Sequence, residues 1–374
     1  MSTAPETATH FRPVPVGLLR GRRPAVPGPA VPAGTGVEVR HPTRLNAMAL
    51  DPSKIVGTAA ADDGEPRGSG HPAGELFVVC DLFRTARVEI VPGSDEVTTT
   101  GHCSRPVLAR HAASVMRELL GITDGLLVHT EGVDLPPHVG LGSSSATMAS
   151  VAVAINELYG RPVEARRLIR FLVDNHGEEI DGRSDSLMPV QCIGGSAAAG
   201  LIPGSVQVVA GNAVPLLSAG LPADYRIVLA MPADPTEWDA QQSLQEEARH
   251  FDDFLRTGRR HAPDIAYRLI HQAWPALLEG EVREFGKLVF DYRFRMGSIK
   301  NCSFSHPRLL EFADAIEPAF TNGAADVLGL SSVGPLFFAV TRTEQKVTEL
   351  FRDAGLRTFA ARPWSEGYSV VKSW

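Results

Sequence analysis

The sequence predicts an α+β protein of two domains. Its 374 residues exceed what one small hydrophobic core organises. Beyond Leu221 the pattern runs strand, several helices, two strands, helix and strand, which is typical of an antiparallel sheet backed by helices. We therefore expect an N-terminal arm over residues 1–36, a first domain over 37–220 and a second domain over 221–374.

Composition narrows the class of protein. Hydrophobic residues make up 44% and charged residues 21%, as in ordinary globular proteins. The net charge of −7 argues against nucleic-acid or anionic-membrane partners, which call for a basic face. The sequence has no uninterrupted run of about 18 apolar residues, so no membrane span is expected. The four cysteines lie far apart and fit a reduced cytoplasmic protein without a zinc site.

Local patterning predicts the elements of the first domain. The arm is rich in Pro, Gly and Ala and lacks the apolar run of a signal peptide, so we expect it to be flexible. Residues 57–74, dense in Gly, Pro and Asp, are expected to form a mobile loop. Helices are predicted over 109–120, ending at Gly121, over the small-residue run from 143, and over 162–173. Strands are predicted over 76–80, 86–91, 125–130, 196–201 and 206–209.

The same patterning applied to the second domain predicts a strand over 225–231. Its predicted helices cover 240–257, 263–279, 282–294, 307–322 and 344–354. Its remaining strands are predicted over 326–330, 336–341, 357–361 and 368–372.

The most informative local feature is a glycine-rich loop that opens the small-residue helix. A helix start presents unpaired backbone N–H groups and the positive end of its dipole, glycines let an anion approach the backbone, and serines add hydroxyl donors. We therefore predict a phosphate site there, with a serine-capped turn that binds nothing as the alternative. His138 could donate to the phosphate, although a lone loop histidine is more often structural. The predicted phosphate ligands are His138, Gly140, Gly142, Ser143, Ser144 and Ser145.

The wider context of the loop resembles a known superfamily. Residues 137–146 resemble the second signature of the galactokinase, homoserine kinase, mevalonate kinase and phosphomevalonate kinase (GHMP) superfamily. Residues 42–46 resemble its first signature and residues 330–338 its third, in the same order. This resemblance implies a ribosomal S5 domain 2-like first part, a ferredoxin-like α/β sandwich as second part, a cleft between them, and a homodimer.

Within the superfamily, the sequence Ser-Ser-Val-Gly-Pro at 331–335 is more similar to β-ribofuranosylaminobenzene 5′-phosphate synthase than to the kinases. Residues 42–51 and 277–286 also resemble that branch. The resemblance implies phosphoribosyl diphosphate as co-substrate and a C–C bond between ribose and a carboxylated aromatic or pyrazole ring, with loss of CO₂ and diphosphate. Similar enzymes make the C-nucleoside antibiotics formycin and pyrazofurin. An ATP-dependent small-molecule kinase and a silent binding protein remain the alternatives.

The chemistry of that reaction fits these residue types. Loss of diphosphate leaves an oxocarbenium-like ribosyl centre, so departing oxyanions need stabilisation more than the reaction needs a strong acid. The superfamily places an aspartate about eight residues before a Gly-Gly pair, and Asp185 lies nine before Gly194. We predict Asp185 as catalytic residue and Mg²⁺ ligand, with Asp181 as a weaker candidate. The alternative is a solvated acidic loop.

Further cations and a second glycine turn complete the predicted site. Arg44 could bind the 5′-phosphate or the acceptor carboxylate in bidentate fashion, or form a surface ion pair instead. Asp81 and Arg84 fall near the substrate strand, but a structural role is favoured for both. A turn around Ser331 is expected to face the loop across the cleft or only to support it. The other predicted substrate ligands are Lys54, Arg293, Arg295, Lys300, Ser331, Ser332 and Gly334.

Overall fold

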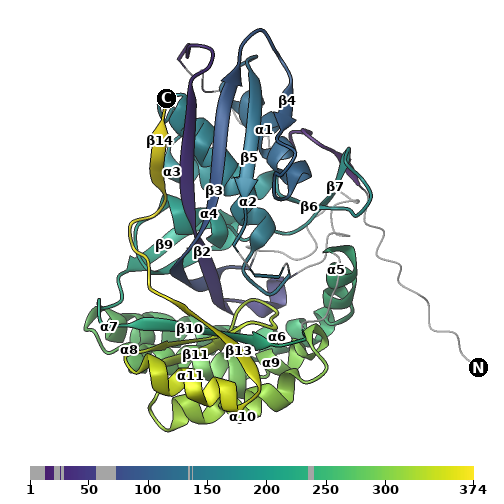
Figure 1. Cartoon of the computed structure of the whole chain (residues 1–374). Coiled ribbons are helices and arrows are strands. Elements are labelled where there is room, and N and C mark those ends of the chain that lie inside the picture. The colour runs from purple at the N-terminus through teal and green to yellow at the C-terminus, as the bar shows by residue number, and fades with distance from the viewer. Residues whose placement is uncertain are drawn as a thin grey trace, which may run out of the picture.

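A computed structural model describes residues 13–20, 26, 29–55, 73–133, 135–136, 138–234 and 240–374. The expected mobile loop at 57–74 lies almost wholly outside these residues, as does much of the N-terminal arm. The described chain forms two α+β layers stacked end to end, with a large sheet and its helices above a smaller sheet and its helices (Figure 1). The predicted α+β fold is confirmed.

The larger sheet has seven strands and carries helices α1–α4 on one face (Figure 1). Its central order is β14-β2-β3-β5-β4, with β8 paired to β3 and β9 paired to β8. The strands are β2 Gly36–Ala49, β3 Glu75–Val91, β4 Val97–Thr99, β5 Gly125–Glu131, β8 Val206–Ala210, β9 Val214–Ala219 and β14 Ser369–Ser373. The helices are α1 Pro106–Leu120, α2 Ser143–Leu158, α3 Ala165–Asp174 and α4 Gly195–Leu201.

One long strand, β3, replaces the two short strands predicted at 76–80 and 86–91. Its pairing with β2 shifts register between Pro42 and Thr43, opposite the segment from Cys80 to Phe83. A register shift of this kind bends a strand without ending it. The polar residues at the bulge therefore gave the false signal of a turn.

The strand predicted over 196–201 is instead the helix α4. Its small side chains are buried against α2 and β2. Gly194 precedes it at φ 113°, and the Glu75 carboxylate accepts a hydrogen bond from the Gly195 amide at 2.7 Å. A carboxylate at a helix start compensates unpaired N–H groups and the dipole. Because this cap comes from 120 residues away, local patterning cannot reveal it.

The smaller sheet is antiparallel, as predicted, with order β11-β12-β10-β13. Its strands are β10 Arg226–Pro232, β11 Val327–Leu330, β12 Phe337–Thr341 and β13 Leu356–Ala361. The helices around it are α5 Ala240–Arg249, α6 Phe251–Arg268, α7 Trp274–Leu278, α8 Val282–Phe290, α9 Ser298–Asn301, α10 Leu309–Thr321 and α11 Glu344–Asp353.

Both ends of the chain depart from the predicted domain limits. The final strand β14 pairs with β2 of the larger sheet, so residues 221–374 are not one continuous unit in space. In the arm, β1 (Val14–Pro15) pairs with β7 (Ser186–Pro189), which in turn pairs with β6 (Gly177–Glu179). The described part of the arm is therefore packed on the first domain, where we expected a flexible segment. None of the described helices combines the length and apolarity that a bilayer crossing requires.

Candidate functional site

A cavity of about 520 Å³ is lined by residues of both layers. The loop after β5, the start of α2 and the segment before α4 form its walls in the first domain. Helices α5 and α6 and the turn after β11 line it from the second domain. Its size is that of a small-molecule site.

The glycine loop is held by direct contact with the second glycine turn. A Cβ on Gly140, whose φ is 95°, would lie 2.2 Å from the Ser331 carbonyl oxygen. Ser331 Oγ donates to the Gly140 carbonyl at 2.8 Å and accepts from the Asn46 amide at 3.1 Å. The turn after β11 therefore supports the loop from below, as the architectural alternative for Ser331 supposed.

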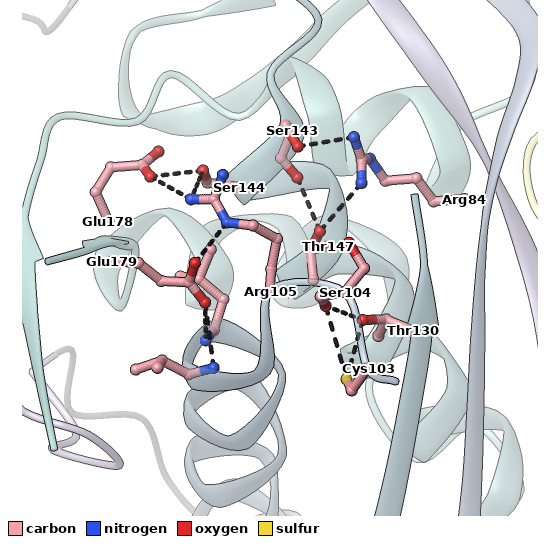
Figure 2. A network of polar contacts seen from close by, with 12 residues as sticks. Arg84, Cys103, Ser104, Arg105, Thr130, Ser143, Ser144, Thr147, Glu178 and Glu179 are labelled. Carbon is pink, nitrogen blue, oxygen red and sulfur yellow. Dashed lines mark hydrogen bonds and ion pairs between the residues drawn. The ribbon is translucent and has the colours of Figure 1, made fainter. Parts of the chain in front are cut away.

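The start of α2 faces Arg84, a buried arginine for which the sequence favoured a structural role. Arg84 donates to Ser143 Oγ at 2.7 Å and to Thr147 Oγ1 at 3.5 Å (Figure 2). Only 6% of Arg84 is exposed. Burial, followed by repulsion from Arg105, lowers the pKa of Arg84 to about 10, so the guanidinium stays charged at neutral pH. A helix start and a buried cation together attract an anion.

Arg105 joins the starts of two helices. It lies within 2.8 Å of both Ser144 Oγ and a Glu178 oxygen, and its Nε lies 2.7 Å from Glu179 (Figure 2). Ser144 Oγ also donates to Glu178 at 2.6 Å. Glu179 in turn accepts the backbone N–H groups of the first two residues after Pro106 in α1. Because Glu178 is shared between Arg105 and Ser144, its carboxylate is held beside the start of α2.

Arg44 lies beside Gly142 of the glycine loop. A Cβ on Gly142 would lie 2.6 Å from Ser196 Oγ and 3.1 Å from Arg44 Nη2, so the loop backbone comes close to this guanidinium. Arg44 Nε lies 3.5 Å from Glu75, which also accepts from Asn46 and the Gly195 amide. The side chain of Arg44 is 12% exposed, and its buried Nε and Nη1 atoms make no hydrogen bond with the described residues. These N–H groups suit an anionic ligand.

Arg293 lines the cavity but its donors are already used. Its guanidinium donates to the backbone oxygens of Asn46, Ala47 and Ser332 and to Ser298 Oγ, at 2.7–3.0 Å. It therefore fastens β2 to the turn after β11. This explains its complete burial better than the predicted contact with substrate does.

Of the predicted site residues, nine line the cavity: Arg44, His138, Gly140, Gly142, Ser143, Ser144, Ser145, Arg293 and Ser332. Lys54, Asp181, Asp185, Arg295, Lys300, Ser331 and Gly334 do not.

The structure contradicts the placement of Asp181 and Asp185 at the reaction centre. Both are exposed in the turn that joins β6 to β7. The backbone of Asp185 accepts from the Val16 amide, which anchors β1 beside this hairpin. The carboxylate of this segment that reaches the cavity is Glu178. Four acidic residues within eight positions gave the sequence no means of choosing among them.

The remaining departures have simple causes. Arg295 is exposed and forms an ion pair with Glu317, and Lys300 is exposed on the short helix α9. The backbone carbonyl of Lys54 accepts a hydrogen bond from the side chain of Gln191, a cavity-lining residue, at 3.1 Å. Gly334 packs against Leu330 and Ser305, below the cavity floor.

Three comparisons describe relatives of the chain. Residues 107–195 match the family described as GHMP kinases N terminal domain. A β-ribofuranosylphenol 5′-phosphate synthase of Archaeoglobus fulgidus is 22% identical over 257 residues, which cover 63% of this chain and 74% of that protein. Its namesake from Methanothermobacter thermautotrophicus is 22% identical over 219 residues, or 55% of this chain and 61% of that protein.

Solved structures share the fold. Homoserine kinase from Cytophaga hutchinsonii superposes with a TM-score of 0.59 over 90% of this chain and 97% of its own, at 15% identity. The domain match covers most of α1, the glycine loop, α2 and the Glu178 segment, and the last three contribute to the cavity wall. Residues 107–195 therefore match the GHMP kinases N terminal domain, the described chain shares the fold of homoserine kinase, and its sequence is similar to the β-ribofuranosylphenol 5′-phosphate synthases.

Proposed function

We propose that the protein is a phosphoribosyl-diphosphate-dependent C-glycosyltransferase that joins ribose 5-phosphate to a carboxylated aromatic or pyrazole ring. The observation that carries this proposal is the convergence of Arg44, Arg84 and Arg105 on the start of α2 within one cavity. A substrate with a diphosphate, a 5′-phosphate and a partner carboxylate offers several anions to such a site. The product named for its two sequence relatives is a ribosylated phenol phosphate, which fits the same chemistry.

The reaction balances without an external base. The bond from ribose C1′ to the diphosphate oxygen breaks, and the electron pair leaves with diphosphate. The ring carbon that bears the carboxylate bonds to C1′, and the electrons of the C–CO₂ bond return to the ring as CO₂ departs. No proton has to be removed from that ring carbon.

The side chains at the start of α2 then act on the leaving group. Its backbone N–H groups, Ser143 and Arg84 would hold the diphosphate and stabilise the charge that develops as the bond breaks. Arg44, with its unused N–H groups, would hold the 5′-phosphate or the acceptor carboxylate. Excluding water from the cavity would protect the ribosyl cation from hydrolysis.

Glu178 and Ser144 are the residues that would hold Mg²⁺. Their oxygens lie 2.6 Å apart beside the start of α2, where a diphosphate would sit. The described residues contain no group of three or more His, Cys, Asp or Glu side chains arranged for a metal. Mg²⁺ commonly uses one or two carboxylates and completes its shell with phosphate oxygens and water, so this sparse set fits. The ion would neutralise charge on the diphosphate.

An ATP-dependent kinase is the competing function, and the shared fold supports it. A kinase of this kind is helped by a carboxylate free to accept the substrate hydroxyl proton. In the cavity, Glu75 is held by Asn46 and Gly195, and Glu178 by Arg105 and Ser144. Of the three carboxylates that the described residues contribute to the cavity wall, these two lie nearest the start of α2 and are occupied, which disfavours a base beside the phosphates; the third, Glu247, lies on α5 of the second domain.

Incubation with phosphoribosyl diphosphate, Mg²⁺ and a series of carboxylated rings, with release of diphosphate and CO₂ measured together, tests the proposal. We expect equimolar release of both products, and none when ATP replaces phosphoribosyl diphosphate. Phosphorylation of a hydroxylated substrate by ATP, without CO₂, would establish the kinase instead.

A further inference from the structure

The cavity has two chemically different ends. The start of α2 and the arginines around it form the cationic end. The other end is built by Ile55, Phe251, Phe254, Cys302 and Val333, which all belong to or pack against one hydrophobic cluster of the second domain. An aromatic ring that carries a carboxylate matches this division, with the ring at the apolar end and the carboxylate toward the arginines.

Glu247 is the acidic side chain placed at the apolar end. It projects from α5 into the cavity, together with Ser243 and Leu244 one turn earlier. It is near enough to Cys302 to influence that thiol electrostatically. Its carboxylate forms no hydrogen bond or ion pair with any residue that the structure describes. Burial raises the pKa of Glu247 to about 7.

A polar group in an apolar wall is costly unless it gains a hydrogen-bond partner. Helix α5 makes few contacts with the rest of the domain, and Glu247 links no elements together. A structural role therefore does not account for this residue. A partner brought by the ligand does, because Glu247 lines the cavity and makes no hydrogen bond with the residues that the structure describes.

We propose that Glu247 sets the specificity for the acceptor by accepting a hydrogen bond from an N–H or O–H group on its ring. The ring would lie against Phe251 and Phe254, with the donor group directed away from the arginines. This inference rests on the proposed function for the identity of the second substrate. It adds which side chain of the cavity would meet the donor group of the ring.

Binding of matched ring pairs tests this inference without relying on turnover. The probes are 4-aminobenzoate and 4-hydroxybenzoate against benzoate, and an aminopyrazole carboxylate against the same pyrazole carboxylate without its amino group. Isothermal titration with the wild-type protein at pH 8, above the pKa of Glu247 of about 7, should show at least one donor-bearing member binding about tenfold or more tightly than its match, the range for a hydrogen bond to a charged group.

The variants Glu247→Leu and Glu247→Gln isolate the carboxylate. In Glu247→Leu the preference should fall below roughly threefold while the donor-free ring binds as well or better. Glu247→Gln, which keeps one acceptor oxygen, should lie between the two. Glu246→Gln is the matched control, because Glu246 is the neighbouring acid on α5 and pairs with Arg249. Thermal unfolding of each variant verifies that it is folded.

The outcomes separate the inference from the proposed function. No donor preference in the wild type, or an undiminished preference in Glu247→Leu, overturns the role of Glu247. A preference that depends on Glu247, without release of diphosphate or CO₂ from any acceptor, supports the ring-binding role and overturns the transferase. Release of both products with an unchanged preference in Glu247→Leu supports the transferase and overturns the role of Glu247.

Discussion

The contact between the glycine loop and the turn after β11 makes Gly140→Ala a decisive substitution. The added Cβ would lie 2.2 Å from the Ser331 carbonyl oxygen, which belongs to the backbone and cannot rotate away. Gly140 also has φ 95°, a conformation that L side chains rarely adopt. The substitution therefore strains the loop and pushes it from its support.

The expected loss of stability combines three terms. Positive φ at a non-glycine residue costs about 1–2 kcal/mol. Relief of the backbone overlap requires a shift of about 1 Å, and overpacking of this kind costs about 1–3 kcal/mol. Weakening the bond from Ser331 Oγ to the Gly140 carbonyl removes about 1 kcal/mol. We expect a total of about 3–6 kcal/mol.

Urea unfolding of the wild type, Gly140→Ala and Gly280→Ala measures these terms. Gly280 has φ 81° and nothing within 4 Å of an added Cβ, so it reports the backbone strain alone. Titration with inorganic diphosphate and Mg²⁺ should also show affinity lowered at least about tenfold in Gly140→Ala only, since the start of α2 moves with the loop. Equal losses of stability in both variants, with diphosphate binding intact, would refute the proposed support of the loop.

Three further results follow from the site. Arg84→Met should weaken diphosphate binding by about 100-fold, because it removes a buried charge-assisted contact. Arg87→Met, on the exposed part of the same strand, is the control and should change diphosphate binding little. Equal effects of the two substitutions would remove Arg84 from the site. Asp185→Asn should leave turnover within about twofold of the wild type, because its side chain lies outside the cavity, and a large loss would restore its predicted role. Glu247→Gln should gain stability relative to the wild type as pH rises from 5 to 8. A raised carboxyl pKa favours folding below its unfolded value of 4.5, and this contribution disappears as pH passes about 7. The pKa shift corresponds to a change in unfolding free energy of about 3 kcal/mol at most, which partial exposure reduces to about 1–2 kcal/mol. If the stabilities of the wild type and Glu247→Gln vary in parallel across this pH range, the prediction is contradicted.

The fold and the phosphate loop could be predicted from the sequence because their signals are local. Glycines at fixed spacing before a run of small residues encode both the φ > 0 turns and the close packing of α2. Alternating and helical periodicity likewise predicted most elements of the second domain. Residues 331–335 marked the supporting turn, although only the structure distinguishes support from substrate contact.

The side chains that contact the loop could not be predicted, because they come from distant segments of the chain. Arg84 and Arg105 reach α2 from 59 and 39 residues away. Neither lies in a distinctive local pattern, and an isolated arginine is usually a surface residue. Glu247 sits on a polar helix whose sequence gives no sign of an apolar pocket beneath one face. Spacing rules failed for Asp185 for the same reason: distance along the chain does not fix which acidic residue of a hairpin turns inward.

The return of β14 to the larger sheet has a mechanical consequence. Among the described elements, the polypeptide passes from one sheet to the other between β9 and β10 and again between β13 and β14. Two covalent connections restrict relative motion of the two halves more than a single connection would. The two halves also cannot be expressed apart by cutting the chain at a single position, since the upper sheet would lose the strand that protects the edge of β2.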